Sequence, residues 1–159
     1  MFSKYKEYLP VGVIVLISLL MALVTHPEDG HQIMAGFMGY FFVIFAMFKF
    51  FDLKGFAEGF AMYDILTQKD VRYAYAYPFI ELLLGLGYLS GIAPFLINLM
   101  AFVIMSISAY GVIKAMMEGL DVRCACLGTV LNVPLSTVSI LENVGMGLMA
   151  LFNLYGILF

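Results

Sequence analysis

The stretch Ala93–Met117, APFLINLMAFVIMSISAYGVIKAMM, decides the fold class of this chain. Lys114, close to its end, is its only charged residue. A helix needs about 20 consecutive apolar residues to cross the hydrocarbon core of a bilayer, and this stretch is long enough. A helix on the surface of a soluble protein would carry a polar face, which is missing here. The stretch therefore predicts a transmembrane helix over about residues 93–117.

Four further apolar runs accompany it, over about residues 9–25, 33–51, 74–90 and 135–158. Apolar residues make up 64% of the sequence and charged residues 12%, against a usual charged share of about 25%. Continuous runs of this kind exclude a barrel of alternating strands. We predict an all-α integral membrane protein. Its single domain, residues 1–159, is a bundle of five transmembrane helices, namely a four-helix core plus an N-terminal helix.

The first run has a basic start, because Lys4 and Lys6 precede it. A basic start is also typical of a secretory signal peptide. No convincing cleavage site of small residues follows the run before His26. We therefore expect an uncleaved membrane anchor. Cleavage, the alternative, would leave four helices in the same orientation.

The basic residues predict the orientation of the bundle. With five alternating spans, all eight Lys and Arg residues fall on one side of the membrane. The positive-inside rule makes that side cytoplasmic. We expect a multi-pass protein of the bacterial inner (plasma) membrane, with a cytoplasmic N-terminus and a periplasmic or extracellular C-terminus. The basic residues are Lys4, Lys6, Lys49, Lys54, Lys69, Arg72, Lys114 and Arg123.

The segment after the second run predicts a short amphipathic helix over about residues 55–67. Phe56, Phe60 and Tyr63 follow one another at helical spacing, with Glu58 and Asp64 interspersed. Such a helix lies in the membrane interface with its apolar face toward the lipid or the bundle. It is either an anchor or a lid over a site at that interface.

The segment Arg123–Gly128, RCACLG, holds the only two cysteines of the chain, Cys124 and Cys126. Thiolate is the reactive and metal-binding form of cysteine, and Arg123 favours it. At this spacing the pair can close a small, strained and easily reduced disulfide ring. The same sulfurs could bind one soft metal ion, such as Cu(I), Hg(II) or Zn(II). The plain alternative is two small apolar residues that happen to be close in sequence.

Two acidic residues, Glu81 and Glu142, lie inside predicted spans. Ionisable groups in a span are costly and are candidates for function. Each lies six or seven residues from the cytoplasmic start of its helix, which is about 10 Å deep at about 1.5 Å per residue. Asn143 adjoins Glu142. These groups are either a proton-handling site or hydrogen-bonding residues that hold the bundle together.

Three places in the sequence resemble a known family. They are Phe48–Phe56 at the end of the second run, Ile80–Leu82 in the third, and Cys124–Gly128 before the last. The last of these is similar to the cysteine-x-cysteine-x-glycine motif of the methylamine-utilisation membrane proteins. From about residue 32 to its end, the chain resembles the MauE/DoxX group of small, redox-associated membrane proteins.

The resemblance implies thiol–disulfide handling, associated with the maturation of a disulfide-rich periplasmic dehydrogenase subunit. The predicted orientation places the cysteines on the opposite, cytoplasmic side. Some relatives of this kind look linked to thiol carriers or heavy-metal-binding domains, which fits a cytoplasmic pair better. The N-terminal helix is additional to the four-helix core of the group.

Our leading interpretation is a membrane thiol–disulfide redox protein. One of Cys124 and Cys126 attacks, the other resolves, and Glu81 accepts the proton. The supporting residues are Arg123, Gly128, Glu142 and Asn143. A quinone and a thiol-carrier protein are the candidate redox partners, beside membrane lipid and a second copy in a homodimer.

Two alternatives stay open. One is a soft-metal transporter for Cu, Hg or Zn, in which Cys124 and Cys126 are the ligands and a metal-binding protein is the partner. The other is a non-catalytic membrane scaffold, and the sequence does not decide whether the chain is an enzyme. No basic patch with interleaved aromatic residues is present, so nucleic acid is not an expected partner.

Overall fold

A computed structural model describes residues 2–62, 64–119 and 135–159. Helices make up almost all of these ranges, and no strand occurs in them, which confirms the predicted all-α class. The helices are α1 (Phe2–Thr25), α2 (Gly30–Phe51), α3 (Leu53–Ala61), α4 (Ile65–Lys69), α5 (Arg72–Ser90), α6 (Pro94–Met117) and α7 (Leu135–Leu158).

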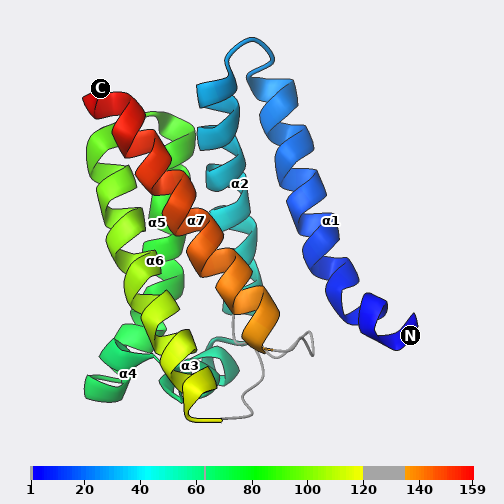
Figure 1. Ribbon diagram of the computed structural model, residues 1–159, viewed down its shortest axis with the longest axis vertical. Helices are drawn as coiled ribbons and strands as arrows, with labels where there is room; N and C mark the ends of the chain where they lie inside the picture. Colours follow the sequence, from blue (N-terminus) through cyan, green and yellow to red (C-terminus); the bar gives the residue numbers. More distant parts are fainter. Residues whose placement is uncertain (1, 63, 120–134) are drawn as a thin grey trace.

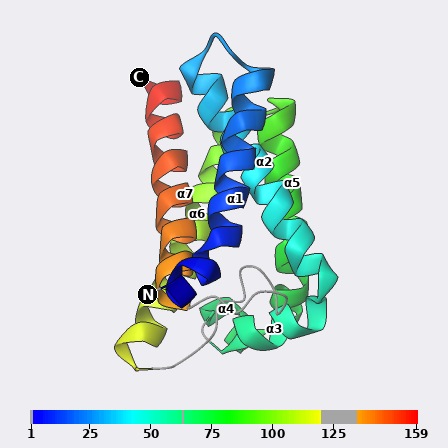
Figure 2. The same ribbon diagram turned by 90° about the vertical axis from the view of Figure 1, so that its right-hand side faces the viewer.

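The long helices run side by side (Figures 1 and 2). Helix α2 packs against α1 and α5, and α6 packs against α7. The α1–α2 turn, the α5–α6 turn and the C-terminus lie at one end of the bundle. Helices α3 and α4 lie across the other end, where α6 ends and α7 begins. We call this second end the α3/α4 end.

Four helices within the described ranges are long and apolar enough to cross a membrane. They are Tyr8–Thr25, Gly30–Phe51, Pro94–Met117 and Ile140–Leu158. The chain therefore has the character of a multi-pass membrane protein. The long helix outside this set is α5, which contains Glu81, Pro78 and several tyrosines that reduce its apolar character.

Between α2 and α5, where the sequence predicts one helix, the chain forms the two short helices α3 and α4. Each has an aspartate at its N-cap. Asp52 accepts a hydrogen bond from the Gly55 N–H, and Asp64 accepts one from the Thr67 N–H. An aspartate in this position satisfies N–H groups that have no partner inside the helix. The Asp64 cap thus starts a new helix within the predicted one.

Helices α2 and α5 approach each other closely at two glycines. A methyl group added to Gly85 would lie 2.9 Å from the Gly39 carbonyl oxygen and 2.7 Å from a Val43 methyl carbon. Small residues allow helix backbones in a membrane to come this near. This contact fixes the relative position of α2 and α5, and hence of the polar side chains that the two helices bury between them.

We predict that Gly85→Ala lowers the free energy of unfolding by about 1–3 kcal/mol, because an extra carbon in a closely packed contact forces the backbones apart. Thermal unfolding of the purified protein in detergent measures the loss. Gly12→Ala is the matched control, since no atom lies within 4 Å of its added methyl group. Equal melting temperatures for the two variants would contradict the close α2–α5 contact.

Candidate functional site

Lys49, in the last turn of α2, is buried inside the bundle with 1% of its surface exposed. It shares one helix face with Phe45, Phe42 and Met38, all of which are fully buried. An ionised amine in such surroundings is very costly unless charged partners surround it. Lys49 therefore points to a polar site within the bundle.

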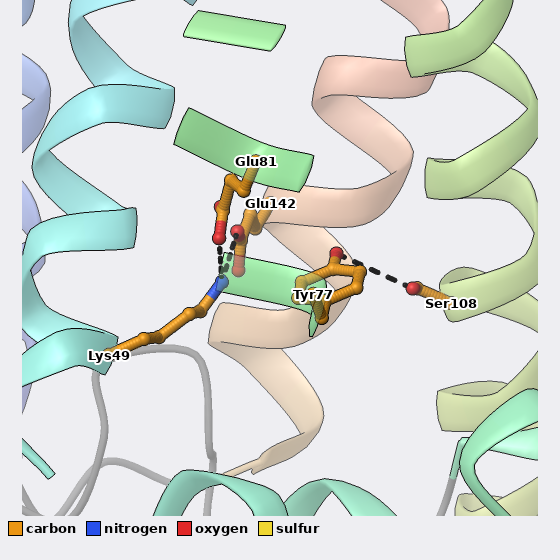
Figure 3. A network of polar contacts seen from close by, with 5 residues as sticks. All are labelled: Lys49, Tyr77, Glu81, Ser108 and Glu142. Carbon is orange, nitrogen blue, oxygen red and sulfur yellow. Dashed lines mark hydrogen bonds and ion pairs between the residues drawn. The ribbon is translucent and has the colours of Figure 1, made fainter. Parts of the chain in front are cut away.

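The partners of Lys49 are two carboxylic acids from two other helices (Figure 3). Its Nζ donates a hydrogen bond to Oε2 of Glu81 on α5, and lies 3.8 Å from Oε1 of Glu142 on α7. Both acids are buried, with exposed fractions of 1% and 4%. We call Lys49, Glu81 and Glu142 the ionic cluster.

Among the residues that the structure describes, the ionic cluster brings two carboxyls to one amine. Ionisable groups buried between membrane-spanning helices are costly and are candidates for function. Because Glu81 and Glu142 lie beside the same amine, the arrangement is suited to proton transfer between the two acids.

Aromatic rings surround the amine of Lys49. Its Nζ lies 4.9 Å from the ring centre of Tyr77, 5.4 Å from that of Phe56 and 5.9 Å from that of Phe45. Cations within about 6 Å of an aromatic ring face are attracted to its negative potential. The rings thus stabilise the amine and keep bulk water away from the cluster.

Helix α3 closes the ionic cluster toward the α3/α4 end. Phe56 and Phe60 of α3 are buried, and their ring centres lie 5.9 and 4.7 Å from that of Tyr77. This helix therefore covers the ionic cluster, and its aromatic side chains are turned toward the bundle. Whether it acts as an anchor or as a lid stays a prediction.

A second polar pair lies beside the ionic cluster, because the Ser108 hydroxyl of α6 donates a 3.5 Å hydrogen bond to the Tyr77 hydroxyl. A small cavity of about 10 Å³ adjoins this pair. That is close to the minimum of about 10–15 Å³ that one water molecule requires. The cavity is lined by Lys49, Phe56, Phe60, Tyr77, Ser108, Glu142 and Asn143.

Asp64 is a buried acid outside the long helices. It accepts 2.9 Å hydrogen bonds from the Thr67 N–H and from the Thr67 hydroxyl. Burial raises the pKa of Asp64 above its ordinary value, although the hydrogen bonds from Thr67 oppose this shift. Ionisation of Asp64 therefore destabilises the folded state, whereas its hydrogen bonds at the N-cap of α4 stabilise it.

The structure brings together Glu81 and Glu142, which the sequence places at the same depth. Asn143 is buried next to them and lines the small cavity. The roles of these residues in chemistry stay predictions. Four predicted site residues lie outside the described residues, namely Cys124, Cys126, Arg123 and Gly128.

Sequence analysis missed Lys49, which it counted as a charge at the cytoplasmic end of a span. The available signal was its register, since it follows Met38, Phe42 and Phe45 on one face of α2. No cluster of three or more His, Cys, Asp or Glu side chains suited to a metal ion occurs within the ranges that the structure covers.

In a comparison with protein families, residues 28–156 match a family described as methylamine utilisation protein MauE. The match runs from just before α2 to near the end of α7, and so leaves out α1. No curated protein and no solved structure matches the chain. The match confirms the resemblance that the sequence motifs indicate.

We predict that Lys49→Met and Glu81→Gln are not additive. Removing one partner of a buried ion pair costs about 3–5 kcal/mol, because the other charge is left uncompensated. The double variant removes both charges and should lose less stability than the two single losses combined. Unfolding of all four proteins in the same detergent measures the coupling. Additive losses would show that the two side chains do not form a pair.

A second prediction concerns Asp64 and pH. Since burial raises the pKa of Asp64 in the folded protein, the folded state favours the protonated acid, and stability falls as pH rises from the ordinary pKa through the raised one. Asp64→Asn keeps an oxygen that can cap α4 but does not ionise. We expect the melting temperature of the variant to increase relative to that of the wild type as pH rises from about 4 to 8. A difference independent of pH would contradict this.

Proposed function

The chain belongs to the MauE family of methylamine utilisation membrane proteins, and from this premise we propose that it carries out thiol–disulfide exchange through Cys124 and Cys126. Its redox partner is a thiol-carrier protein or a lipid-soluble quinone. The ionic cluster takes up the protons that this exchange releases.

One observation carries the proposal. Among the described residues, the carboxyls of Glu81 and Glu142 meet at the Lys49 amine inside the bundle, and such groups can accept and release protons. Oxidation of two thiols to a disulfide releases two electrons and two protons, and the electrons pass to the partner. A buried acid that shares its proton with a second acid is suited to accept and pass on these protons.

The placement of the helices supports a link between the cluster and the cysteines. Lys49 lies in the last turn of α2, toward the α3/α4 end. Helix α6 ends and α7 begins at that same end, and the chain between them carries Cys124 and Cys126. Glu142 lies within two turns of the start of α7, so a short stretch of helix joins it to the cysteine-bearing segment.

In the proposed exchange, one cysteine attacks as thiolate, with Arg123 favouring that form. The sulfur bonds to a sulfur of the partner disulfide, whose second sulfur leaves as a thiolate. The other cysteine then attacks the cysteine sulfur of this mixed disulfide, closes the Cys124–Cys126 ring and releases the remaining partner sulfur as a second thiolate. Glu81 accepts the proton, Glu142 and Lys49 stabilise the resulting charge, and Asn143 lines the neighbouring cavity. Gly128 is a further supporting residue of the cysteine motif.

We further propose that α5 is a fifth span, with the N-terminus and the α3/α4 end in the cytoplasm of a bacterium. Helix α5 contributes Glu81 and Tyr77 to the interior, so these two polar residues face protein partners and not lipid. Lys49 is buried and no longer counts as an exposed charge. Lys54, Lys69, Arg72 and Lys114 still place basic residues toward the α3/α4 end.

A thiol count on the purified protein tests the exchange. We expect maleimide to label no cysteine in the isolated protein and both cysteines after mild reduction. We expect Glu81→Gln to keep these counts but to slow reoxidation by a disulfide partner about 100-fold, the lower range for loss of an acid–base group. Cys124→Ser and Cys126→Ser should each abolish the cycle.

Two results would contradict the proposal. If the cysteines are isolated reduced and one equivalent of Cu(I) or Hg(II) blocks both, the pair is a metal site. If the double Cys→Ser variant supports growth on methylamine as well as the wild type, the chain is a scaffold.

A further inference from the structure

A cavity of about 440 Å³ lies at the end of the bundle opposite the α3/α4 end. The α1–α2 turn, the α5–α6 turn and the C-terminus are found at this end (Figure 1). The residues that line the cavity come from both turns and from the helices α2, α5, α6 and α7. Its volume falls within the range of about 300–1,000 Å³ that is usual for small-molecule sites. We call it the turn-end cavity.

The polar side chains of the turn-end cavity are imidazoles, amides and hydroxyls. They belong to His26, His31, Gln32, Tyr88, Ser90, Asn98 and Asn153. Among the residues that the structure describes, no Asp, Glu, Lys or Arg lines this cavity. An ion of either sign would lose its hydration there without a fixed counter-charge. The lining therefore favours an uncharged molecule.

Tyr88 and Asn98 form a buried polar pair in the wall of the turn-end cavity. The Tyr88 hydroxyl donates a 2.7 Å hydrogen bond to Oδ1 of Asn98, and Nδ2 of Asn98 donates a 2.8 Å hydrogen bond to the Pro94 carbonyl. These bonds fix the pair in place and engage the hydroxyl proton of Tyr88. The hydroxyl oxygen can still accept a hydrogen bond. The pair therefore presents an acceptor to a molecule in the cavity.

Asn153 of α7 supplies a second acceptor. It lines the cavity and is 1% exposed, and its Nδ2 lies 3.5 Å from the Met38 sulfur. Among the described residues, its Oδ1 has no hydrogen-bond partner, which is costly for a buried oxygen. The last torsion of an asparagine side chain is broad, so the amide can turn and bring Oδ1 toward a donor in the cavity.

Apolar side chains complete the walls of the turn-end cavity. Ala35 of α2, Leu89 of α5, Ile97 of α6 and Ile157 of α7 contribute them. A molecule that is polar on every side would leave these walls without a matching surface. The cavity therefore suits a molecule with an apolar body and a hydrogen-bond donor at one end.

We propose that the turn-end cavity binds a small uncharged molecule in which an N–H or O–H donor is joined to an apolar body, such as an aromatic amide or alcohol. The donor bonds to Oδ1 of Asn153 and to the hydroxyl oxygen of Tyr88, and the body packs against the apolar walls. This site goes beyond the thiol exchange proposed above, because α6 ends and α7 begins at the opposite end of the bundle.

Two substitutions change the site in different ways. Asn153→Leu replaces a buried amide oxygen that lacks a partner with an apolar group of similar size, so the melting temperature without ligand should stay equal or rise. Ala35→Leu adds bulk to a wall of the cavity. Gly30→Leu is the matched control for Ala35→Leu, because Gly30 begins the same helix, has no atom within 4 Å of an added methyl group and lies outside the lining.

The test uses the full chain in nanodiscs, with a benzamide that carries a diazirine on its ring as photoprobe. We expect labelled peptides from α2 and α7, and we expect excess benzamide or benzyl alcohol to compete the labelling away. N,N-Dimethylbenzamide lacks the donor, and benzamidine and benzoate carry a charge on the same ring, so each should compete at least tenfold less well. Asn153→Leu and Ala35→Leu should lower labelling at least tenfold, and Gly30→Leu should label like the wild type.

Three results would overturn this site. Labelling that neither benzamide nor benzyl alcohol competes would show a hydrated vestibule only. Competition by benzamidine, benzoate or N,N-dimethylbenzamide as strong as that by benzamide would contradict an uncharged donor as the recognised group. Labelling that both Asn153→Leu and Ala35→Leu leave unchanged would place the probe outside the turn-end cavity. The Cys124→Ser/Cys126→Ser variant should label like the wild type, and a loss of labelling there would contradict a site separate from the thiol exchange.

Discussion

The burial of Lys49 against Glu81 and Glu142 is the constraint on which the rest of the structure depends. An amine and two carboxyls from three separate helices meet inside a membrane bundle. Leaving any one of these charges without its partner would cost several kcal/mol. The helices α2, α5 and α7 must therefore keep their relative heights and rotations. The close α2–α5 contact at Gly39 and Gly85 serves this requirement, since it fixes two of the three helices on the same side of the cluster.

The short helix α3 covers the ionic cluster at the α3/α4 end of the bundle. A helix that only anchored the chain at the interface would turn its aromatic residues toward lipid. Phe56 and Phe60 are instead buried and pack against Tyr77. A lower dielectric constant strengthens an ion pair. By excluding water, the aromatic side chains of α3 therefore strengthen the interaction of Lys49 with its two acids. The same cover limits how protons reach the cluster from the α3/α4 end.

The sequence predicts the parts of this site that follow from helix geometry. The depth of Glu81 and Glu142 follows from the rise per residue and from where each helix begins, so their shared level could be predicted. Lys49 could not, because a lysine near the end of an apolar run usually reaches out to the interface. Its inward direction depends on acids from α5 and α7, which no local pattern reveals. The number of spans is hard to predict for a related reason. Glu81 lowers the apolar character of α5 in the sequence, although in the fold it is paired with Lys49 of another helix. The cysteine pair lies outside the described residues, so its approach to the acids stays a prediction.

The second acid is what separates the ionic cluster from a simple structural ion pair. A single Lys–Glu pair could hold two helices together without passing on a proton. Glu142 adds a second titratable group beside the same amine, and it comes from α7, the helix that follows the cysteine-bearing segment. It also lines the small cavity beside Tyr77 and Ser108, which is close to the size of one water molecule. Two acids beside one amine and a cavity of this size are the parts that a proton path from the cysteine-bearing segment into the bundle would need.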